Sequence, residues 1–295
     1  MSKNRPILST DELFPTFVFV THGGPLEAKS ALLAASLGEY YIPKKLFTRI
    51  MMPEERWGAL GEDTVALFHD IGVEMQAGEN EIDLNYPHGN KITSMRGLDG
   101  PCIFLDSDML MMAPFTWHYC LNADAALKPA DLDTFSAGGG SWARVWDAFG
   151  MEIPPKTWKA TLSQEKMRPY FNAGFISVKN GNAFSEVWLE VAREIDQEVG
   201  ITNKRPWLDQ IALPVALKKL GWQPRELEIS FNFPNHLTGM AGGLPYISHY
   251  HWPKVIAKEP ALLSLVTRLV KKHPTLTSIM SRYDEWRVVT EKIDI

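Results

Sequence analysis

Two aspartates lie two positions apart directly after an apolar run. Cys102-Ile-Phe-Leu105 follows Pro101 and leads into Asp106-Ser107-Asp108. Four apolar residues in a row predict a buried strand, so both carboxylates are expected at a strand end, where open α/β sheets bind ligands. Carboxylates at i and i+2 in a turn can hold one hard cation and leave positions for phosphate oxygens. The segment therefore predicts a metal-assisted phosphate site.

The same spacing occurs at Asp131-Leu132-Asp133, which serves as an internal comparison. An Asp-x-Asp triplet arises by chance about once in a chain of this length and average composition. The second triplet lies in a polar stretch without an apolar run before it, so we interpret it as a solvated loop or a helix cap. The preceding strand distinguishes the pair Asp106 and Asp108.

Short β-branched, aromatic and apolar runs predict the strands that carry this site. They cover residues 16–21, 45–51, 71–75, 102–105 and 173–178, and a late strand or loop is expected over 247–252. Helical spacing of apolar residues predicts helices over 26–37, 53–67, 183–198 and 208–220, with Pro214 bending the last one or lying in its first turn. Glycines at 138–140 and prolines at 154–155 indicate loops. Strands alternating with helices predict an α/β fold.

Composition excludes several classes of protein. Apolar residues make up 45% of the 295 residues and charged residues 22%, which is the balance of a globular chain. The 30 basic and 35 acidic side chains leave a net charge of -5, which argues against a non-specific nucleic-acid binder. The two cysteines, Cys102 and Cys120, fit neither a disulfide scaffold nor a zinc site, and indicate reduced thiols in a cytoplasmic protein.

The sequence contains no recognisable targeting or membrane-spanning segment. Pro6, Asp11 and Glu12 interrupt the first 15 residues, where a signal peptide needs an apolar stretch. The run 109–113 falls far short of the ~20 apolar residues of a membrane helix. The stretch 260–286 mixes apolar with basic residues, which predicts an amphipathic helix packed on the domain, with peripheral membrane contact as the alternative.

Five segments together resemble one enzyme family. Phe104-Leu-Asp-Ser-Asp-Met resembles the Asp-x-Asp metal motif of nucleotide-sugar-dependent glycosyltransferases with the GT-A fold. The other four resemble, in the order of the family, motifs of the glycogenin-like and galactosyltransferase-like glycosyltransferase family 8: Tyr170-Phe-Asn-Ala-Gly-Phe-Ile, Asp209-Gln210, Phe231-Asn232 and Ile247-Ser-His-Tyr-His-Trp-Pro-Lys254. The resemblance covers residues 14–255. It implies a GT-A domain over 1–255, with a Rossmann-like mixed sheet flanked by helices, and a C-terminal helical extension over 256–295.

The resemblance implies a metal site for Mn²⁺ or Mg²⁺. Its ligands would be Asp106, Asp108 and His249, and imidazole with carboxylates suits a borderline ion such as Mn²⁺. His251 is the alternative to His249, and we expect the two rings to point to opposite faces of a strand. The spacing to Lys254 favours His249.

The same resemblance implies contacts to a nucleotide-sugar donor. Lys254 would contact the diphosphate, and Lys91, rather than Arg96, would be the basic residue near the phosphate or sugar. The remaining donor contacts would be Thr21, His22, Gly23 and Ser107 for the nucleoside and metal end, Asn172, Ala173 and Gly174 beneath the sugar, and Asp209 and Gln210 at its hydroxyls. Asp209 could instead be a helix N-cap, Lys254 a surface lysine and residues 22–24 a tight turn. Trp207, Trp252 and Trp142 are candidate platforms for an acceptor sugar.

The function that the resemblance implies is transfer of a hexose from a nucleotide-diphosphate sugar, with UDP as the expected nucleotide, to a saccharide, lipid or protein acceptor such as a glycan or glycolipid. Val255-Ile256 replaces the Pro-Trp that usually follows the family's lysine. The alternatives are a non-catalytic nucleotide-sugar-binding protein and a phosphohydrolase of the haloacid dehalogenase type. A dinucleotide-binding Rossmann enzyme lacks support, because no Gly-x-Gly-x-x-Gly is present.

Overall fold

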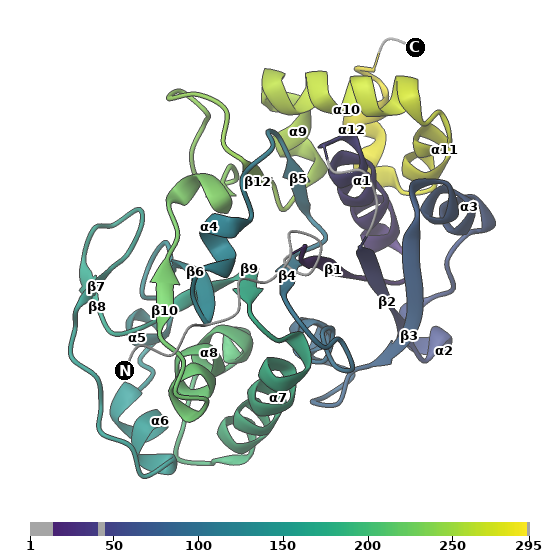
Figure 1. Ribbon diagram of the computed structural model, residues 1–295. Helices are drawn as coiled ribbons and strands as arrows, with labels where there is room; N and C mark the ends of the chain where they lie inside the picture. Colours follow the sequence, from purple (N-terminus) through teal and green to yellow (C-terminus); the bar gives the residue numbers. More distant parts are fainter. Residues whose placement is uncertain (1–13, 41–44, 294–295) are drawn as a thin grey trace, which may run out of the picture.

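The computed structural model describes residues 14–40 and 45–293. Residues 1–13, which hold most of the segment examined for a signal peptide, lie outside the described residues. A seven-stranded sheet with the order β10-β6-β9-β4-β1-β2-β3 forms the centre (Figure 1). Its strands are β1 (Thr16–Thr21), β2 (Leu46–Met52), β3 (Val73–Glu79), β4 (Cys102–Leu105), β6 (Ala125–Pro129), β9 (Phe171–Val178) and β10 (Pro224–Glu226). Only β9 runs antiparallel to its neighbours β4 and β6, so the predicted mixed α/β sheet is confirmed.

The central strands are buried on both faces, as their continuous apolar runs require. On β1, Phe17 and Phe19 belong to one apolar core, whereas Val18 and Val20 belong to the other. The strand β4 divides in the same way, with Ile103 and Leu105 on the first side and Cys102 and Phe104 on the second. The strand alternation therefore separates two cores, one on each face of the sheet.

Helices cover both faces (Figure 1). The first core includes side chains of α1 (Pro25–Tyr40), α3 (Glu62–Ile71), α10 (Pro260–Lys272) and α11 (Thr275–Ser281). The second includes side chains of α6 (Trp142–Ala148), α7 (Gly181–Gln197) and α8 (Leu208–Lys219). The shorter helices are α2 (Glu54–Trp57), α4 (His118–Leu121), α5 (Thr134–Ala137), α9 (Pro253–Lys258), α12 (Arg287–Thr290), η1 (Pro87–Lys91), η2 (Ile229–Phe231) and η3 (Asp284–Trp286).

A small sheet joins the end of the domain to its middle. It has the order β11-β12-β5, with β5 (Met109–Met111), β11 (Phe233–Pro234) and β12 (Ile247–His249). Because β5 begins one residue after Asp108, this pairing carries the segment 247–249 to the end of β4. A separate hairpin consists of β7 (Trp158–Lys159) and β8 (Lys166–Met167).

Three predictions about helices need correction. The helix predicted over 53–67 is two helices, α2 and α3, with an intervening turn that contains Gly58 and Gly61. Pro214 lies in the interior of α8 and not in its first turn. The predicted helix over 260–286 is divided into α10, α11 and η3, because Pro274 begins a new helix.

The C-terminal helices pack on the sheet domain. Leu262, Leu265 and Leu269 of α10 share the first core with α1. The buried carboxylate of Glu27 in α1 accepts hydrogen bonds from Thr64 of α3 and from Tyr283, beyond α11. The apolar side of the 260–286 stretch is therefore covered by protein. In the part of the chain that the structure describes, no helix is both long and apolar enough to cross a bilayer.

Candidate active site

Asp106 lies at the carboxyl end of β4, beside β9. Its backbone N–H donates to the carbonyl of Gly174 over 2.8 Å. A Cβ at position 174 would lie 3.1 Å from Oδ2 of Asp106 and 2.7 Å from the methyl group of Met109. Glycine at 174 is therefore what leaves space for the Asp106 carboxylate.

The small sheet brings His249 to Asp108, although 141 positions separate them. His249 pairs with Met109, the residue after Asp108. Its Nε2 lies 3.0 Å from Oδ1 of Asp108 and 4.0 Å from Oδ2 of Asp106. Burial alone would raise the pKa of the Asp108 carboxyl, but the imidazoles of His249 and His251 outweigh it and hold that pKa well below its usual range.

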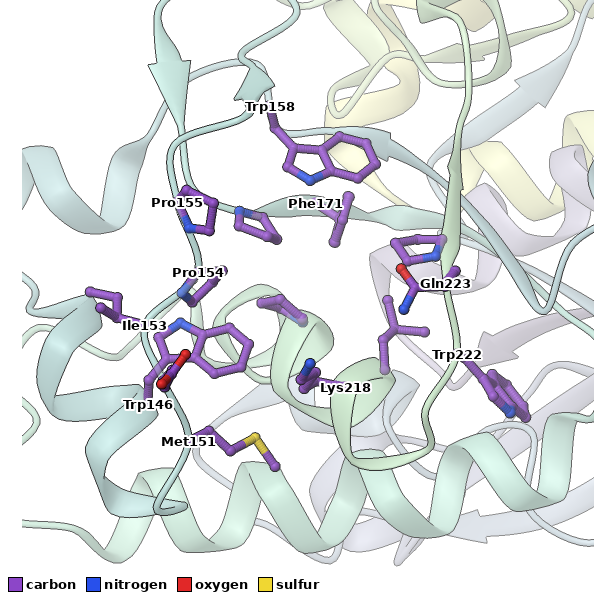
Figure 2. Close-up of a pocket in the computed structure, with 15 residues that line it drawn as sticks. Trp146, Met151, Ile153, Pro154, Pro155, Trp158, Phe171, Lys218, Trp222 and Gln223 are labelled. Carbon is purple, nitrogen blue, oxygen red and sulfur yellow. The ribbon is translucent and has the colours of Figure 1, made fainter.

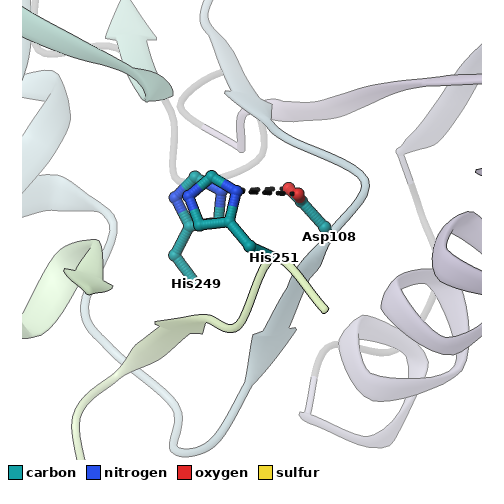
Figure 3. Close-up of side chains that lie close together, drawn as sticks. All are labelled: Asp108, His249 and His251. Atoms are coloured by element: carbon teal, nitrogen blue, oxygen red, sulfur yellow. Dashed lines mark hydrogen bonds and ion pairs between the residues drawn. The ribbon is translucent and has the colours of Figure 1, made fainter. Parts of the chain in front are cut away.

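The expectation that His249 and His251 point to opposite faces of a strand is wrong, since residues two positions apart in a regular strand share a face and these two do not lie in one regular strand. The strand β12 ends at His249, Tyr250 is buried, and His251 has a left-handed backbone with a φ of 58°. This turn stacks the two imidazole rings, whose centroids are 4.0 Å apart and whose planes are 18° from parallel. Nδ1 of His251 lies 3.4 Å from Oδ2 of Asp108, so both histidines face one carboxylate (Figure 3).

Two asparagines determine which nitrogen of His249 carries the hydrogen. The N–H of Gly174 donates to Oδ1 of Asn172 over 2.8 Å, and that oxygen also accepts from Nδ2 of Asn232 over 2.8 Å. The remaining oxygen of Asn232 lies 3.1 Å from Nδ1 of His249. Since an amide oxygen only accepts, Nδ1 of His249 carries the hydrogen and Nε2 is left for a proton or a metal ion.

Lys91 joins two carboxylates, the buried Asp209 and the partly buried Asp106. Its Nζ lies 2.7 Å from Oδ1 of Asp106 and 3.3 Å from Oδ2 of Asp209. Burial alone would lower the pKa of the Lys91 ammonium, but Asp106 and then Asp209 raise it above its usual range. The hydroxyl of Tyr86 donates to Oδ1 of Asp209 over 3.1 Å and accepts from the N–H of Asp209. The N-cap of α8 is Trp207, so the alternative role of Asp209 as a helix N-cap is wrong.

The residues present fit a divalent cation. The ligand atoms of Asp108, His249 and His251 all lie within 4.8 Å of one another, and Asp106 adds a carboxylate beside them. Because Nδ1 of His249 is a donor to Asn232, the lone pair of Nε2 and the Asp108 carboxylate can share a cation between them. Carboxylates with imidazole form a ligand set for a borderline ion such as Mn²⁺.

Two adjoining cavities open on this cluster, and both include Lys91 and Asp106 in their walls. The first, of about 200 Å³, lies towards the turn between β1 and α1 and is lined by His22, Ser107 and Asp108 among others. The second, of about 320 Å³, is lined by residues from the ends of β6 and β9, from α8 and from the segment after β12. The acidic cluster therefore lies where the two cavities meet.

Only some of the residues predicted to contact the nucleoside line a cavity. His22 and Ser107 line the first cavity, and burial lowers the pKa of the His22 imidazole. The side chain of Thr21 is buried against Ser30, 2.6 Å away, and does not line either cavity. A Cβ at Gly23 would lie 2.5 Å from the carbonyl oxygen of Ala59, so glycine at this position serves the close approach of the turn after α2.

The residues predicted around the sugar come together in the second cavity. Its walls include Asn172, Ala173, Gly174, Asp209, Gln210, Trp207, Trp252 and His249. The indole of Trp252 is 49% exposed, and Leu237, also in this wall, is 53% exposed. The cavity thus combines polar groups near Asp106 with accessible apolar side chains.

The chain matches the Rhodobacterales glycosyltransferase domain over residues 17–221, which is more than half of its length. It belongs to that family. This match identifies a glycosyltransferase domain and sets aside the haloacid-dehalogenase-like alternative. The matched residues include Lys91, both metal-motif aspartates and Asp209, whereas His249 and Lys254 lie beyond them.

Several solved structures of glycosyltransferases are similar to this chain. The galactosyltransferase LgtC, determined with donor and acceptor sugar analogues, is 14% identical, with a TM-score of 0.51 over 92% of this chain and 99% of its own. Mouse xyloside xylosyltransferase 1 is 12% identical, with a TM-score of 0.49 over 80% of this chain and 97% of its own. The glycosyltransferase GlyE of Streptococcus pneumoniae TIGR4 is 15% identical, with a TM-score of 0.48 over 80% of this chain. This chain covers 55% of GlyE, about half of its length. A comparison with curated proteins found no match. The similarity to LgtC establishes the GT-A type fold.

Some of the residues predicted to contact the donor or the acceptor lie away from the two cavities. Lys254 lies in the first turn of α9, with Nζ 5.1 Å from the ring centre of Trp252, and is not part of either cavity wall. Arg96 pairs with Glu81 and Glu186 on another part of the surface. Trp142 is buried against Phe135 and Tyr170, so it cannot serve as an acceptor platform.

The structure bears out only part of the interpretation of Asp131-Leu132-Asp133 as a solvated loop or a helix cap. Asp133 caps α5 by accepting from the N–H of Ser136, which confirms the helix-cap interpretation for that residue. Asp131 is not solvated: it is buried and pairs over 2.5 Å with Nζ of Lys128, whose side chain is fully buried. Burial lowers the pKa of this lysine. Asp131 also contributes to the wall of the second cavity.

Sequence reasoning assigned no role to two residues that hold the site together. The sequence indicates Asn232 only as part of the Phe231-Asn232 motif, yet its amide connects Asn172 with His249. Tyr86 had no sequence signal, because a single tyrosine before Pro87 fits many loops. It lies in the site because α8 and the turn before η1 come together, and its hydroxyl oxygen also lies 2.9 Å from the carbonyl oxygen of Pro206, which shares the single hydroxyl hydrogen with Asp209.

A larger cavity of about 530 Å³ lies elsewhere in the glycosyltransferase (Figure 2). Its walls are mainly aromatic and proline side chains, including Trp146, Trp158 and Phe171. Phe171 lines this cavity, whereas the next residue, Asn172, lines the second cavity of the acidic cluster. Adjacent residues of a strand point to opposite faces, so β9 separates the two spaces. None of the residues of the acidic cluster lines the larger cavity.

Proposed function

We propose that the protein transfers a hexose from a nucleotide-diphosphate sugar to a glycan or glycolipid acceptor with the help of a divalent metal ion, and that the donor is a UDP-hexose. The observation that carries this proposal is the convergence of Asp106, Asp108 and His249 at the carboxyl end of β4. The similarity to glycosyltransferase family 8 supports UDP as the nucleotide.

Charge explains why a cation is needed. The ammonium of Lys91 pairs with Asp106 and Asp209, and Asp108 adds a third carboxylate to this largely buried cluster. A diphosphate that entered this cluster would face excess negative charge. Asp106, Asp108 and His249 would hold Mn²⁺, or less favourably Mg²⁺, and when bound the ion neutralises charge on the nucleoside diphosphate as it leaves.

The two cavities support a division of the donor between them. We assign the nucleoside to the first cavity, beside His22 and Ser107, and the hexose to the second. There Asn172 is held by the N–H of Gly174 and by Asn232, so its position is fixed before the sugar arrives. Gln210 and Asp209 contribute the polar groups that would orient the sugar hydroxyls, and Lys91 positions Asp209.

We assign the acceptor to the open side of the second cavity. Trp207 and Trp252 lie in its wall, and the exposed indole of Trp252 offers a flat apolar face on which a sugar ring can stack. Lys254, next to Trp252 on α9, would contact the diphosphate only if the 247–254 segment moves towards the donor. We propose this movement as a closing step.

A thermal-unfolding screen with nucleotide sugars tests the proposal. A donor at 100 times its Kd stabilises the folded state by about 2.7 kcal/mol. We expect a UDP-hexose to raise the unfolding temperature in the presence of Mn²⁺ and to have little effect after chelation with EDTA. Release of UDP from the stabilising donor would then establish turnover. Stabilisation that is equal with and without metal would contradict the metal dependence, and stabilisation by another nucleotide sugar alone would contradict the choice of UDP.

A further inference from the structure

We infer that the metal site takes two imidazoles, His249 and His251, and that this second histidine makes the site selective for transition-metal ions over Mg²⁺. The inference rests on the proposed metal-dependent function, and adds a ligand to the set of Asp106, Asp108 and His249. It names the class of metal ion that the site accepts.

The geometry around Asp108 carries the inference. Each of its carboxylate oxygens faces a different histidine: Oδ1 lies 3.0 Å from Nε2 of His249, and Oδ2 lies 3.4 Å from Nδ1 of His251 (Figure 3). The three ligand atoms lie within 4.8 Å of one another. Contraction of these distances around a common ion brings two nitrogens and a carboxylate into one coordination sphere, with Asp106 beside them.

The position of His251 is supported from two other elements. Lys29 of α1 donates to the carbonyl of His251 over 2.8 Å, which holds the left-handed turn at this residue. The ring of His236 packs edge-on against His251 with centroids 3.9 Å apart. Residues that keep an uncommon backbone conformation under such support gather at functional sites. Nδ1 of His251 is therefore presented to Asp108 by contacts from outside its own segment.

The chemistry of the ligands gives the selectivity. Mg²⁺ prefers an octahedral shell of oxygens and retains several waters. Imidazole suits later first-row ions, and affinity at such a site rises from Mn²⁺ to Co²⁺. A site with two nitrogens should thus bind Co²⁺ more tightly than Mn²⁺, and both far more tightly than Mg²⁺. Loss of one nitrogen should weaken Co²⁺ more than Mg²⁺.

The test uses His251→Asn in the full chain, because asparagine tolerates the left-handed conformation at this position. His88→Asn is the matched control: His88 lines both cavities but is exposed and is not among the three clustered ligands. Titration calorimetry with Co²⁺, Mn²⁺ and Mg²⁺ gives the affinities. Pulsed electron paramagnetic resonance of bound Mn²⁺, on protein labelled with ¹⁵N-histidine, counts the coordinated imidazoles with and without UDP.

We expect two histidine nitrogens on Mn²⁺ in the unsubstituted protein and in His88→Asn, and one in His251→Asn. Co²⁺ affinity should fall at least about tenfold in His251→Asn, the lower end of the effect that even outer-shell partners have. One imidazole in the unsubstituted protein, or unchanged Co²⁺ affinity in His251→Asn, would overturn the inference while leaving the proposed function intact. A protein that binds none of these ions, with or without UDP, would overturn both.

Discussion

Nδ1 of His249 lies 3.1 Å from the amide oxygen of Asn232, and this contact decides how the histidine presents itself to Asp108. Asn232 is held in turn by Asn172, which is held by the N–H of Gly174. A residue on β9 thus sets the orientation of a ring on β12. Partners of this kind fix the tautomer of a ligating histidine and raise its basicity.

Asn232→Ala should weaken Mn²⁺ binding by about 10- to 100-fold, because His249 loses the acceptor that fixes its tautomer. Titration calorimetry with Mn²⁺ measures the change. Asn235→Ala is the control: Asn235 is also buried beside β12, but its side chain accepts from Ser248 and not from the ring of His249. Equal losses of Mn²⁺ affinity in both variants would show that the affinity falls because the small sheet is disrupted, and not because the tautomer of His249 changes.

Asp108→Asn should abolish Mn²⁺-dependent binding of UDP-hexose with little effect on the unfolding temperature, since a ligand oxygen and its charge are lost at the centre of the cluster. Calorimetry with Mn²⁺ and the donor decides this. Asp133→Asn provides the control, because Asp133 caps a short helix and belongs to the second Asp-x-Asp triplet. Retained metal-dependent binding in Asp108→Asn would remove this residue from the metal site.

Asp131→Asn should lower the free energy of unfolding by about 3 kcal/mol, because it leaves the fully buried Lys128 ammonium without its carboxylate. Asp131 is therefore unsuitable as a neutral control for metal binding, although its sequence pattern suggested that use. Urea unfolding measures the change. Stability within about 0.5 kcal/mol of the unsubstituted protein, the range of ordinary surface substitutions, would contradict a structural role for this pair.

Lys91→Met should lower the unfolding temperature of the metal-free protein, because Asp106 and Asp209 lose their shared counter-ion. Added Mn²⁺ should restore most of the loss, since the ion supplies positive charge at Asp106, and Mn²⁺ affinity should not fall. Donor turnover should fall because Asp209 is no longer positioned. Unfolding scans with and without Mn²⁺, combined with turnover, test these effects. A variant that loses Mn²⁺ binding would show that Lys91 supports the metal and does not compete with it.

Glu27→Gln should destabilise the protein by about 2 kcal/mol. The Glu27 carboxylate is almost fully buried and accepts from Thr64, from the N–H of Gly61 and from Tyr283, and an amide cannot accept at both of its atoms. Glu285→Gln, an exposed change on the same C-terminal stretch, should have no measurable effect. Equal urea midpoints for all three proteins would mean that Glu27 does not hold the C-terminal helices to α1 and α3.

The local pattern of the sequence was enough to predict four of the central strands, β1, β2, β4 and β9, and the place of the chemistry, although β6 was not predicted. The strand β4 begins and ends where the apolar run does, and the two aspartates follow it directly. Such features depend on neighbouring residues: a continuous apolar run is buried on both faces of a covered sheet, Pro101 precedes this run, and a turn follows where polar residues end it. The order of the motifs then allowed the enzyme family to be recognised before any contact was known.

The contacts across the chain were decided by the tertiary structure alone. A regular strand would place His249 and His251 on one face, but β12 ends at His249, and it is the left-handed turn held by Lys29 that brings both rings to Asp108. The Asp131 triplet resembled a solvated loop because the sequence shows Lys128 three residues earlier but not that its side chain is buried. Sequence spacing describes where a side chain would point in a regular element, whereas these side chains lie at element ends, where packing against distant segments sets the backbone angles and supplies the partner charges.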